Sequence, residues 1–335
     1  MPPEASASPG LTETLANLNI FYILAIVAVL TVLRLALVPL RNPTARSVAE
    51  ILESGMIAVA LVFLIIRPFI LQAFYIPSPS MEPTLLGKNN SGDRILVNKF
   101  EYRVDKPHRD DVVVFLAPLA ATRPDLPDDS EFIKRLIAMP GDRLEVRSGY
   151  MMAGSKRINH PELRQELAKA GVFGPEAQAV GDVDQADHHA KYVSNGVMAD
   201  THLVTKAELA KIFTGMESAP VSVHPGIVIL NGVTLNEPFI AEDPDYDLKI
   251  YNGESLKHDY SFGIWILDGQ PIPQSRFNTL WAGPTQPLPA ARYMMMGDNR
   301  NDSKDSTVWG PLEARRVVGR AQFIFWPLPR LGVIR

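Results

Sequence analysis

The sequence predicts an N-terminal transmembrane helical hairpin followed by a mainly antiparallel β domain that carries a partly helical insertion. Two observations predict this fold class. Apolar residues concentrate between residues 20 and 74, and from Arg94 onward short apolar or alternating runs are separated by turn residues. At 335 residues with 46% hydrophobic content, the chain is long enough to fold as one large domain or two ordinary ones.

Composition excludes several function classes. The formal net charge of −4 gives no reason to expect a nucleic-acid partner. The chain has no cysteine, which excludes disulfides, thiol catalysis and cysteine-ligated zinc. His188 and His189 are adjacent, and neighbouring side chains usually point apart, so a solvated loop is favoured there over a metal site. We expect neither a metal nor a cofactor.

The first predicted span covers residues 20–40, after an extracytoplasmic tail of residues 1–19. About 20 apolar residues of helix cross a bilayer core. A cleavable signal peptide would need a basic start, but residues 1–33 contain no lysine or arginine, so a retained span is favoured.

The second predicted span covers residues 51–74. Its densest apolar part, Met56 to Ile66, is short and could on its own be a buried core helix. With Glu53 and Arg67 reaching toward the interfaces, the whole segment is long enough to cross.

Basic residues predict the orientation. Arg34, Arg41 and Arg46 surround the connection at residues 41–50, which the positive-inside rule assigns to the cytoplasm. Residues 75–335 then form the extracytoplasmic β domain. A bacterial cytoplasmic membrane is the simplest location.

The soluble part is predicted to consist of short strands joined by tight turns, which is typical of an antiparallel domain. The predicted strands are residues 94–97, 111–117, 132–138, 143–146, 227–230, 292–296 and 317–326. Residues of roughly 155–222 form the insertion, with helical spacing at residues 161–169 and 206–213.

Two serines lie directly after the second apolar segment. Ser78 and Ser80 are braced by Pro77, Pro79 and Pro83, which restrict the backbone. A small hydroxyl on a stiff backbone suits a nucleophile, although a proline-rich linker is the other interpretation.

A serine nucleophile needs a base, and the residues allow two kinds. None of the seven histidines is selected by its context; His108 is the most plausible partner for a Ser-His-Asp arrangement. Lys134 lies in a strand-like run on the same face as Phe132 and Leu136, where loss of hydration would lower its pKa. A surface lysine–arginine pair with Arg135 is the alternative.

Four segments together resemble the ordered motifs of type I signal peptidases, a family of Ser/Lys-dyad serine proteases. They are Ser78-Pro-Ser-Met-Glu-Pro-Thr-Leu85, Arg109-Asp-Asp-Val-Val-Val-Phe115, Phe132-Ile-Lys-Arg-Leu-Ile-Ala-Met-Pro-Gly-Asp142 and Met296-Gly-Asp-Asn-Arg-Asn-Asp-Ser-Lys-Asp-Ser306. Trp309-Gly-Pro-Leu312 and Val318-Gly-Arg-Ala321 extend the match.

The resemblance implies a role for each matching residue. Ser80 would be the nucleophile and Lys134 its general base. Ser78 would help the backbone N–H of Ser80 to hold the oxyanion, and Ser303 would orient the lysine amine. Asp298 and Asp305 would be supporting carboxylates.

The resemblance also implies the substrate. Family members cleave signal peptides from exported preproteins after small residues, and the lipid bilayer and the secretion translocon are further expected partners. Shallow apolar pockets would select those residues. The matching positions are Phe74, Ile76, Leu85, Ile95, Val114, Phe132 and Ile133. The substrate would bind as an added strand.

Three residues depart from the family pattern. Pro79 and Asp110 stand where glycine is common, and Thr307 stands where an arginine often pairs with the residue equivalent to Asp305. Two other functions stay open from the residues alone: a membrane-anchored Ser-His-Asp hydrolase, and a non-catalytic, membrane-anchored β module that binds extended peptides.

Overall fold

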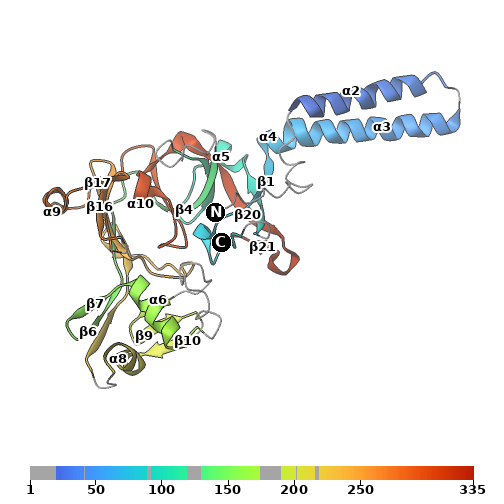
Figure 1. The fold of residues 1–335 in the computed structure, drawn as a ribbon. Helices are drawn as coiled ribbons and strands as arrows, with labels where there is room; N and C mark the ends of the chain where they lie inside the picture. Colours follow the sequence, from blue (N-terminus) through green and yellow to red (C-terminus); the bar gives the residue numbers. More distant parts are fainter. Residues whose placement is uncertain are drawn as a thin grey trace, which may run out of the picture.

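A computed structural model describes residues 20–40, 42–88, 92–118, 130–173, 190–200, 202–215, 219–260 and 262–335. The predicted tail at residues 1–19 and the His188–His189 pair lie outside these residues. The chain folds as a projecting pair of helices joined to a β-rich body (Figure 1).

The projecting pair consists of α2 (Ile20–Leu37) and α3 (Pro43–Leu61). Asn42 caps α3 by accepting a hydrogen bond from the Thr44 N–H, and Pro43 occupies the first helical position, where proline is favoured. The two helices pack antiparallel (Figure 1). Arg34 Nη2 lies 2.8 Å from Glu53 Oε2 across the pair, so each charge has a partner within an otherwise apolar surface.

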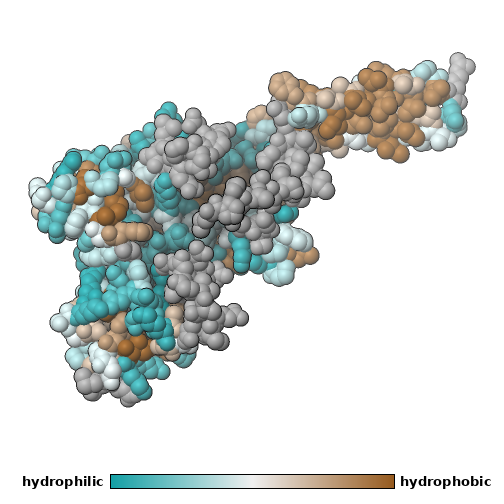
Figure 2. All heavy atoms as spheres, in the orientation of Figure 1, coloured by the Kyte–Doolittle hydropathy of each residue, from teal (hydrophilic) through white to brown (hydrophobic). Residues whose placement is uncertain are grey.

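Only one helix among the described residues is long and apolar enough to cross a membrane by itself. It covers Pro43–Phe69, because α3 continues through η1 (Val62–Ile66) into α4 (Arg67–Phe69), and 6% of its most apolar window is buried. Figure 2 shows an apolar surface over most of the helix pair. The apolar part of α2, Phe21–Leu37, is shorter, so a second span stays a prediction.

The helix boundaries differ from the expected 51–74. The helix begins eight residues earlier, since Asn42 and Pro43 start it, and residues expected in the cytoplasmic connection are therefore helical. It ends at Phe69, because Leu71–Tyr75 form β1 and pair with β2 (Arg94–Asn98).

The sheet that carries β1 has eight strands. Its order is β1, β2, β20 (Val317–Trp326), β3 (Val112–Leu116), β4 (Glu131–Ala138), β18 (Arg292–Met296) and β19 (Leu312–Glu313), with β21 (Gly332–Val333) also paired to β20. The short helical segments around it are α5 (Glu101–Val104), α10 (Ser306–Trp309), η5 (Ala314–Arg316) and η6 (Leu328–Arg330).

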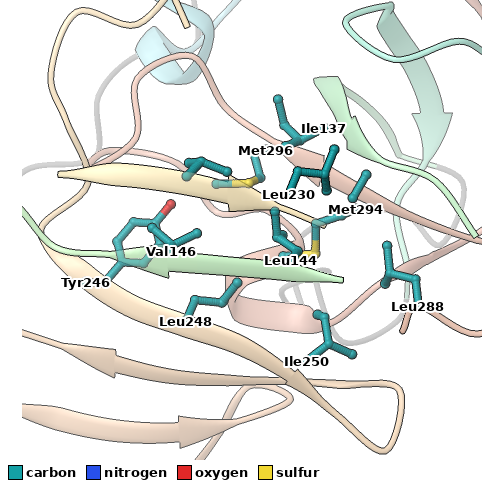
Figure 3. Close-up of a cluster of buried hydrophobic side chains, with 12 residues drawn as sticks. Ile137, Leu144, Val146, Leu230, Tyr246, Leu248, Ile250, Leu288, Met294 and Met296 are labelled. Carbon is teal, nitrogen blue, oxygen red and sulfur yellow. The ribbon is translucent and has the colours of Figure 1, made fainter. Parts of the chain in front are cut away.

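A second sheet has seven strands. Its order is β13 (Val233–Thr234), β12 (Ile227–Leu230), β5 (Leu144–Arg147), β14 (Tyr246–Tyr251), β15 (Glu254–Asp259), β16 (Ile264–Leu267) and β17 (Gln270–Ile272), followed in the chain by helix α9 (Gln274–Trp281). A buried cluster that includes Ile137, Val146, Leu248 and Met294 joins the two sheets (Figure 3).

The insertion is a folded unit between Tyr150 and His224, slightly longer than expected. Its described residues form two three-stranded sheets and two helices: β6 (Tyr150–Ala153), β7 (Lys156–Ile158), α6 (His160–Lys169), β8 (Ala190–Val193), β9 (Gly196–Ala199), β10 (His202–Thr205), α8 (Lys206–Thr214) and β11 (Val221–His224). Its side chains form a separate buried cluster, so it has a core of its own.

The antiparallel prediction is confirmed, because every strand pair among the described residues is antiparallel. The ranges expected for β12, β18 and β20 agree with the observed strands, and the other predicted strands are displaced by one residue or less at each end.

Candidate active site

Ser80 lies in a short 3-10 turn that follows the edge strand β1. The turn is η2 (Pro79–Met81), and Pro79 occupies its first position, which suits a proline. Ser80 is 7% exposed, whereas Ser78 is exposed. The two hydroxyl oxygens are 3.3 Å apart. The sequence therefore presents one buried and one exposed hydroxyl at the same turn.

Lys134 reaches Ser80 from β4, 54 residues further along the chain. Its Nζ lies 2.6 Å from Ser80 Oγ and 2.8 Å from the carbonyl oxygen of Ile133. Lys134 is only 4% exposed. The structure thus brings together the two residues that the sequence selected for chemistry.

The ionisation of Lys134 is set by burial. Burial lowers the pKa of its ammonium from the usual value to about 8, while the carboxylates of Asp305, Asp298 and Asp302 act in the opposite direction. About a tenth of the amine is therefore neutral at pH 7, and a neutral amine can accept a proton.

The loop of residues 297–305 packs directly on the Ser80 turn. The Asn299 N–H donates to the Ser80 carbonyl oxygen over 3.2 Å, and the Asn299 side-chain amide lies 3.4 Å from the Pro79 carbonyl oxygen. Gly297 has no room for a side chain, because a Cβ there would lie 2.4 Å from the Ser80 carbonyl oxygen and 2.3 Å from Ser303 Oγ. Ser303 is thus beside the site, but its buried hydroxyl makes no hydrogen bond within the described chain.

A fully buried ion pair supports the same loop. Arg135 Nη2 lies 2.6 Å from Asp298 Oδ2 and its Nε lies 2.8 Å from Asp298 Oδ1, and both side chains are inaccessible to solvent. Thr84, four residues after Ser80, also donates to Asp298 over 2.5 Å. Sequence reasoning proposed Asp298 but missed Arg135 and Thr84 as its partners, although Arg135 is adjacent to Lys134.

Comparison with known proteins decides the family. The family model described as "Signal peptidase, peptidase S26" matches residues 48–204 and 197–326, which is most of the chain. The chain belongs to the peptidase S26 family of signal peptidases. The predicted resemblance is therefore confirmed.

Similar curated proteins carry the same description. Signal peptidase I of Aquifex aeolicus is 28% identical over 278 residues, covering 83% of each chain. A probable signal peptidase I-2 of Synechocystis is 27% identical over 285 residues, covering 84% of this chain and 77% of that protein. A solved signal peptidase I from Enterococcus faecalis matches 64% of this chain and 97% of its own at 16% identity, with a TM-score of 0.25, which does not establish a common fold.

The family-matched pocket positions fall in two different buried clusters, one of which also contains Met81 of the Ser80 turn. Ile76, Leu85, Ile95 and Val114 are buried together, with Phe74 and Ile133 packed against them. Phe132 faces a different cluster, with Phe115 and Trp309, because strand neighbours alternate between faces. The first six are contiguous beneath the turn, and their selection of substrate side chains stays a prediction.

The departures from the S26 pattern have structural explanations. Asp110 has a φ of 69°, a left-handed conformation that favours glycine, and its carbonyl oxygen accepts a hydrogen bond from Arg135. Asp305 does not need an arginine at position 307, because its carboxylate caps α10 by accepting from the Thr307 N–H and also accepts from the Gly297 N–H. The hydrogen bonds of the Asp305 side chain therefore fix the loop.

An ion pair between Arg330 and Asp93 was not predicted from the sequence. Arg330 donates to both oxygens of Asp93, which is 1% exposed, and to the Thr84 carbonyl oxygen. Asp93 in turn accepts from the Leu86 N–H through its side chain and from the Ile76 N–H through its backbone. The pair thereby holds both flanks of the segment that contains Ser80. No local motif marks Arg330, since its partners are more than 200 residues away.

His108 is exposed and lies 3.9 Å from Asp105. Among the described residues, the side chains of Lys134 and Ser78 lie within hydrogen-bond distance of Ser80 Oγ, and His108 does not. Among the described residues, no group of three or more histidine, aspartate or glutamate side chains is arranged to hold a metal ion.

Proposed function

We propose that this chain is a membrane-bound serine endopeptidase that removes N-terminal signal peptides, with Ser80 as nucleophile and Lys134 as general base. The observation that carries the proposal is the 2.6 Å contact between Lys134 Nζ and Ser80 Oγ inside a buried site. This distance is within the range required for direct proton transfer. Family membership supports the same reaction class.

In the first step the neutral Lys134 amine accepts the Ser80 hydroxyl proton as Oγ attacks the scissile carbonyl carbon. Negative charge develops on the carbonyl oxygen, and donors that are already oriented stabilise it best. The Ser80 N–H and the exposed Ser78 hydroxyl, 3.3 Å from Ser80 Oγ, are the donors that we assign.

In the second step the C–N bond breaks and the Lys134 ammonium donates its proton to the leaving amine. This leaves the signal peptide as an ester on Ser80. A water molecule then attacks the ester, again giving its proton to Lys134, and the peptide acid is released with Ser80 restored. Each half-reaction returns the lysine to its neutral form.

Free strand edges beside the dyad support binding of an extended substrate. β4 pairs with β18 only from Arg135 to Ala138, so among the described strands the backbone of Phe132–Lys134 is paired with β3 alone. Strand β1 is at the edge of the same sheet. A peptide added along these edges would bring its bond to Ser80, and the closely packed Ile76 and Leu85 favour small side chains.

The helix that leads into β1 supports a membrane location. Residues 43–69 would cross the bacterial cytoplasmic membrane, with α2 as a second span and the catalytic part on the extracytoplasmic side. Exported preproteins, the lipid bilayer and the secretion translocon are the partners that we propose.

The direct test is cleavage of a preprotein that has alanine at the first and third positions before the scissile bond. We expect the detergent-solubilised full-length chain to cut it once, with the new N-terminus identified by mass spectrometry. His108→Ala should cleave at the wild-type rate, because His108 is exposed and makes no described hydrogen bond to Ser80 or Lys134. Loss of activity in that variant would favour a histidine triad, and failure of the wild-type chain to cleave would leave a peptide-binding module.

The pH dependence follows from the buried base. The lysine pKa of about 8 means that the amine becomes protonated, and inactive as a base, as pH falls below that value. We expect kcat/KM to decrease roughly tenfold per pH unit on the acid side, about a hundredfold from the plateau to pH 6. A pH–rate profile that is flat between pH 6 and 9 would contradict a lysine base.

A further inference from the structure

The insertion is joined to the body of the molecule through two adjacent buried carboxylates, Glu242 and Asp243. They are 2% and 1% exposed. They lie in the segment between β13 and β14, outside the insertion and outside the loop that packs on Ser80. Burial of two carboxylates is costly unless hydrogen-bond donors surround them, and both have such donors.

On one side the donors come from the insertion. Glu242 Oε1 accepts from the Ala190 N–H over 2.9 Å, and Glu242 Oε2 accepts from Arg164 Nη1 over 2.8 Å. Asp243 Oδ1 accepts from the Tyr192 N–H over 2.9 Å. Helix α6 and strand β8 are thereby both fixed to the carboxylate pair.

On the other side the side-chain donor is Asn301, in the loop that contacts Ser80, and the backbone Gly226 N–H also donates to Asp243 Oδ2. Asn301 Nδ2 donates to Glu242 Oε2 over 3.0 Å and to the Asp243 carbonyl oxygen over 3.1 Å. Its Oδ1 accepts from the Asp245 N–H over 2.8 Å. All three bonds of this side chain go to residues 242–245, and Arg164 shares one of the acceptor oxygens.

The position of this loop determines the geometry at Ser80. The loop contacts the Ser80 carbonyl oxygen through the Asn299 N–H and has no free space at Gly297. A displacement of the loop would therefore change the alignment of Ser80 with Lys134. Misplacement by about 1 Å can reduce a rate by about 10²-fold.

We infer that Asn301 is a positioning residue that connects the insertion to the active-site loop through Glu242 and Asp243. The inference rests on the proposed function, because its main readout is cleavage. Asn301 touches neither Ser80 nor Lys134 in the described contacts, so it acts through the loop. The insertion then supports the catalytic geometry and is not an independent appendage.

The test uses the full-length chain in detergent with the alanine-containing preprotein. Asn301→Ala should lower kcat about 10- to 100-fold and leave KM within about twofold, since the loop is displaced but the strand edges remain. Arg164→Ala should lower kcat less, and the double variant should be no slower than Asn301→Ala, because both residues act through Glu242.

Thr205→Ala is the matched control. It removes the capping box of α8 and so weakens the insertion without contacting Glu242 or Asp243. Its kcat should equal that of the wild-type chain. A wild-type kcat in Asn301→Ala, additive losses in the double variant, or an equal loss in Thr205→Ala would overturn the inference.

Hydrogen exchange provides a readout that does not require activity. Backbone amides in residues 297–305 should exchange at least about tenfold faster in Asn301→Ala than in the wild-type chain, and at the wild-type rate in Thr205→Ala. If the wild-type chain does not cleave the preprotein, the proposed function fails, and the exchange rates alone decide the role of Asn301. Unchanged exchange in Asn301→Ala would reject it.

Discussion

Replacing Lys134 by alanine is expected to lower kcat/KM by at least about 10⁴-fold, because the Ser80 hydroxyl then has no base within hydrogen-bond distance. Ser80→Ala should have an effect of similar size. The double variant should be no worse than either single variant, since the two residues act as a unit. Cleavage of the preprotein, followed by mass spectrometry, measures all three.

A second buried lysine provides the control. Lys249 is also 4% exposed, burial lowers its pKa, and its ammonium donates to the carbonyl oxygens of Trp281 and Gly283, outside the site. Lys249→Ala should therefore retain cleavage activity under conditions in which it is folded. Persistent cleavage by Lys134→Ala, with product formation sensitive to Ser80→Ala, would reject the dyad.

Removing Asp298 is expected to cause the largest loss of stability among the residues of the site. Asp298→Ala leaves the Arg135 guanidinium buried without its carboxylate partner. Breaking such a pair typically costs about 3–5 kcal/mol of unfolding free energy. Denaturant unfolding in detergent, followed by tryptophan fluorescence, measures this loss.

Glu166→Ala is the matched control for that measurement. Glu166 pairs with Lys169 on the surface of α6, where the lysine side chain is 59% exposed. Exposed pairs of this kind contribute about 0–1 kcal/mol. If Asp298→Ala destabilised the chain no more than Glu166→Ala, the buried pair would not be the main support of the loop.

Much of the fold could be predicted because local patterns coincide with local structure. The alternating and apolar runs gave β12, β18 and β20 with their observed bounds. The hairpins of the second sheet were missed, although their signals are present. Asn252-Gly253, between β14 and β15, and Asp268-Gly269, between β16 and β17, both have positive φ values, as tight turns of this kind require.

The site was predictable only in part. Ser80 and Lys134 are marked by short motifs, but the contacts that hold them are long-range. Asp93 and Arg330 are 237 residues apart, and Asn301 is 59 residues from Glu242. Sequence periodicity indicates which face of a helix or strand is buried. It does not indicate which polar side chains, far apart in the sequence, form hydrogen bonds or ion pairs.

The segment that connects the apolar helix to Ser80 is short, and this has a consequence for the proposed selection of the scissile bond. Only Ile70 separates α4 from β1, and it is fixed at both ends, since its N–H donates to Ile66 and its carbonyl accepts from Lys99. β1 itself adds about 17 Å of stiff backbone. Helix α4 leads directly into β1 (Figure 1), and the turn with Ser80 follows β1, so Ser80 is held at one height above the end of the helix. With the helix in a bilayer, Ser80 would lie at a fixed distance from the lipid surface. The scissile bond would then be selected by its distance from that surface as well as by the side chains next to the bond.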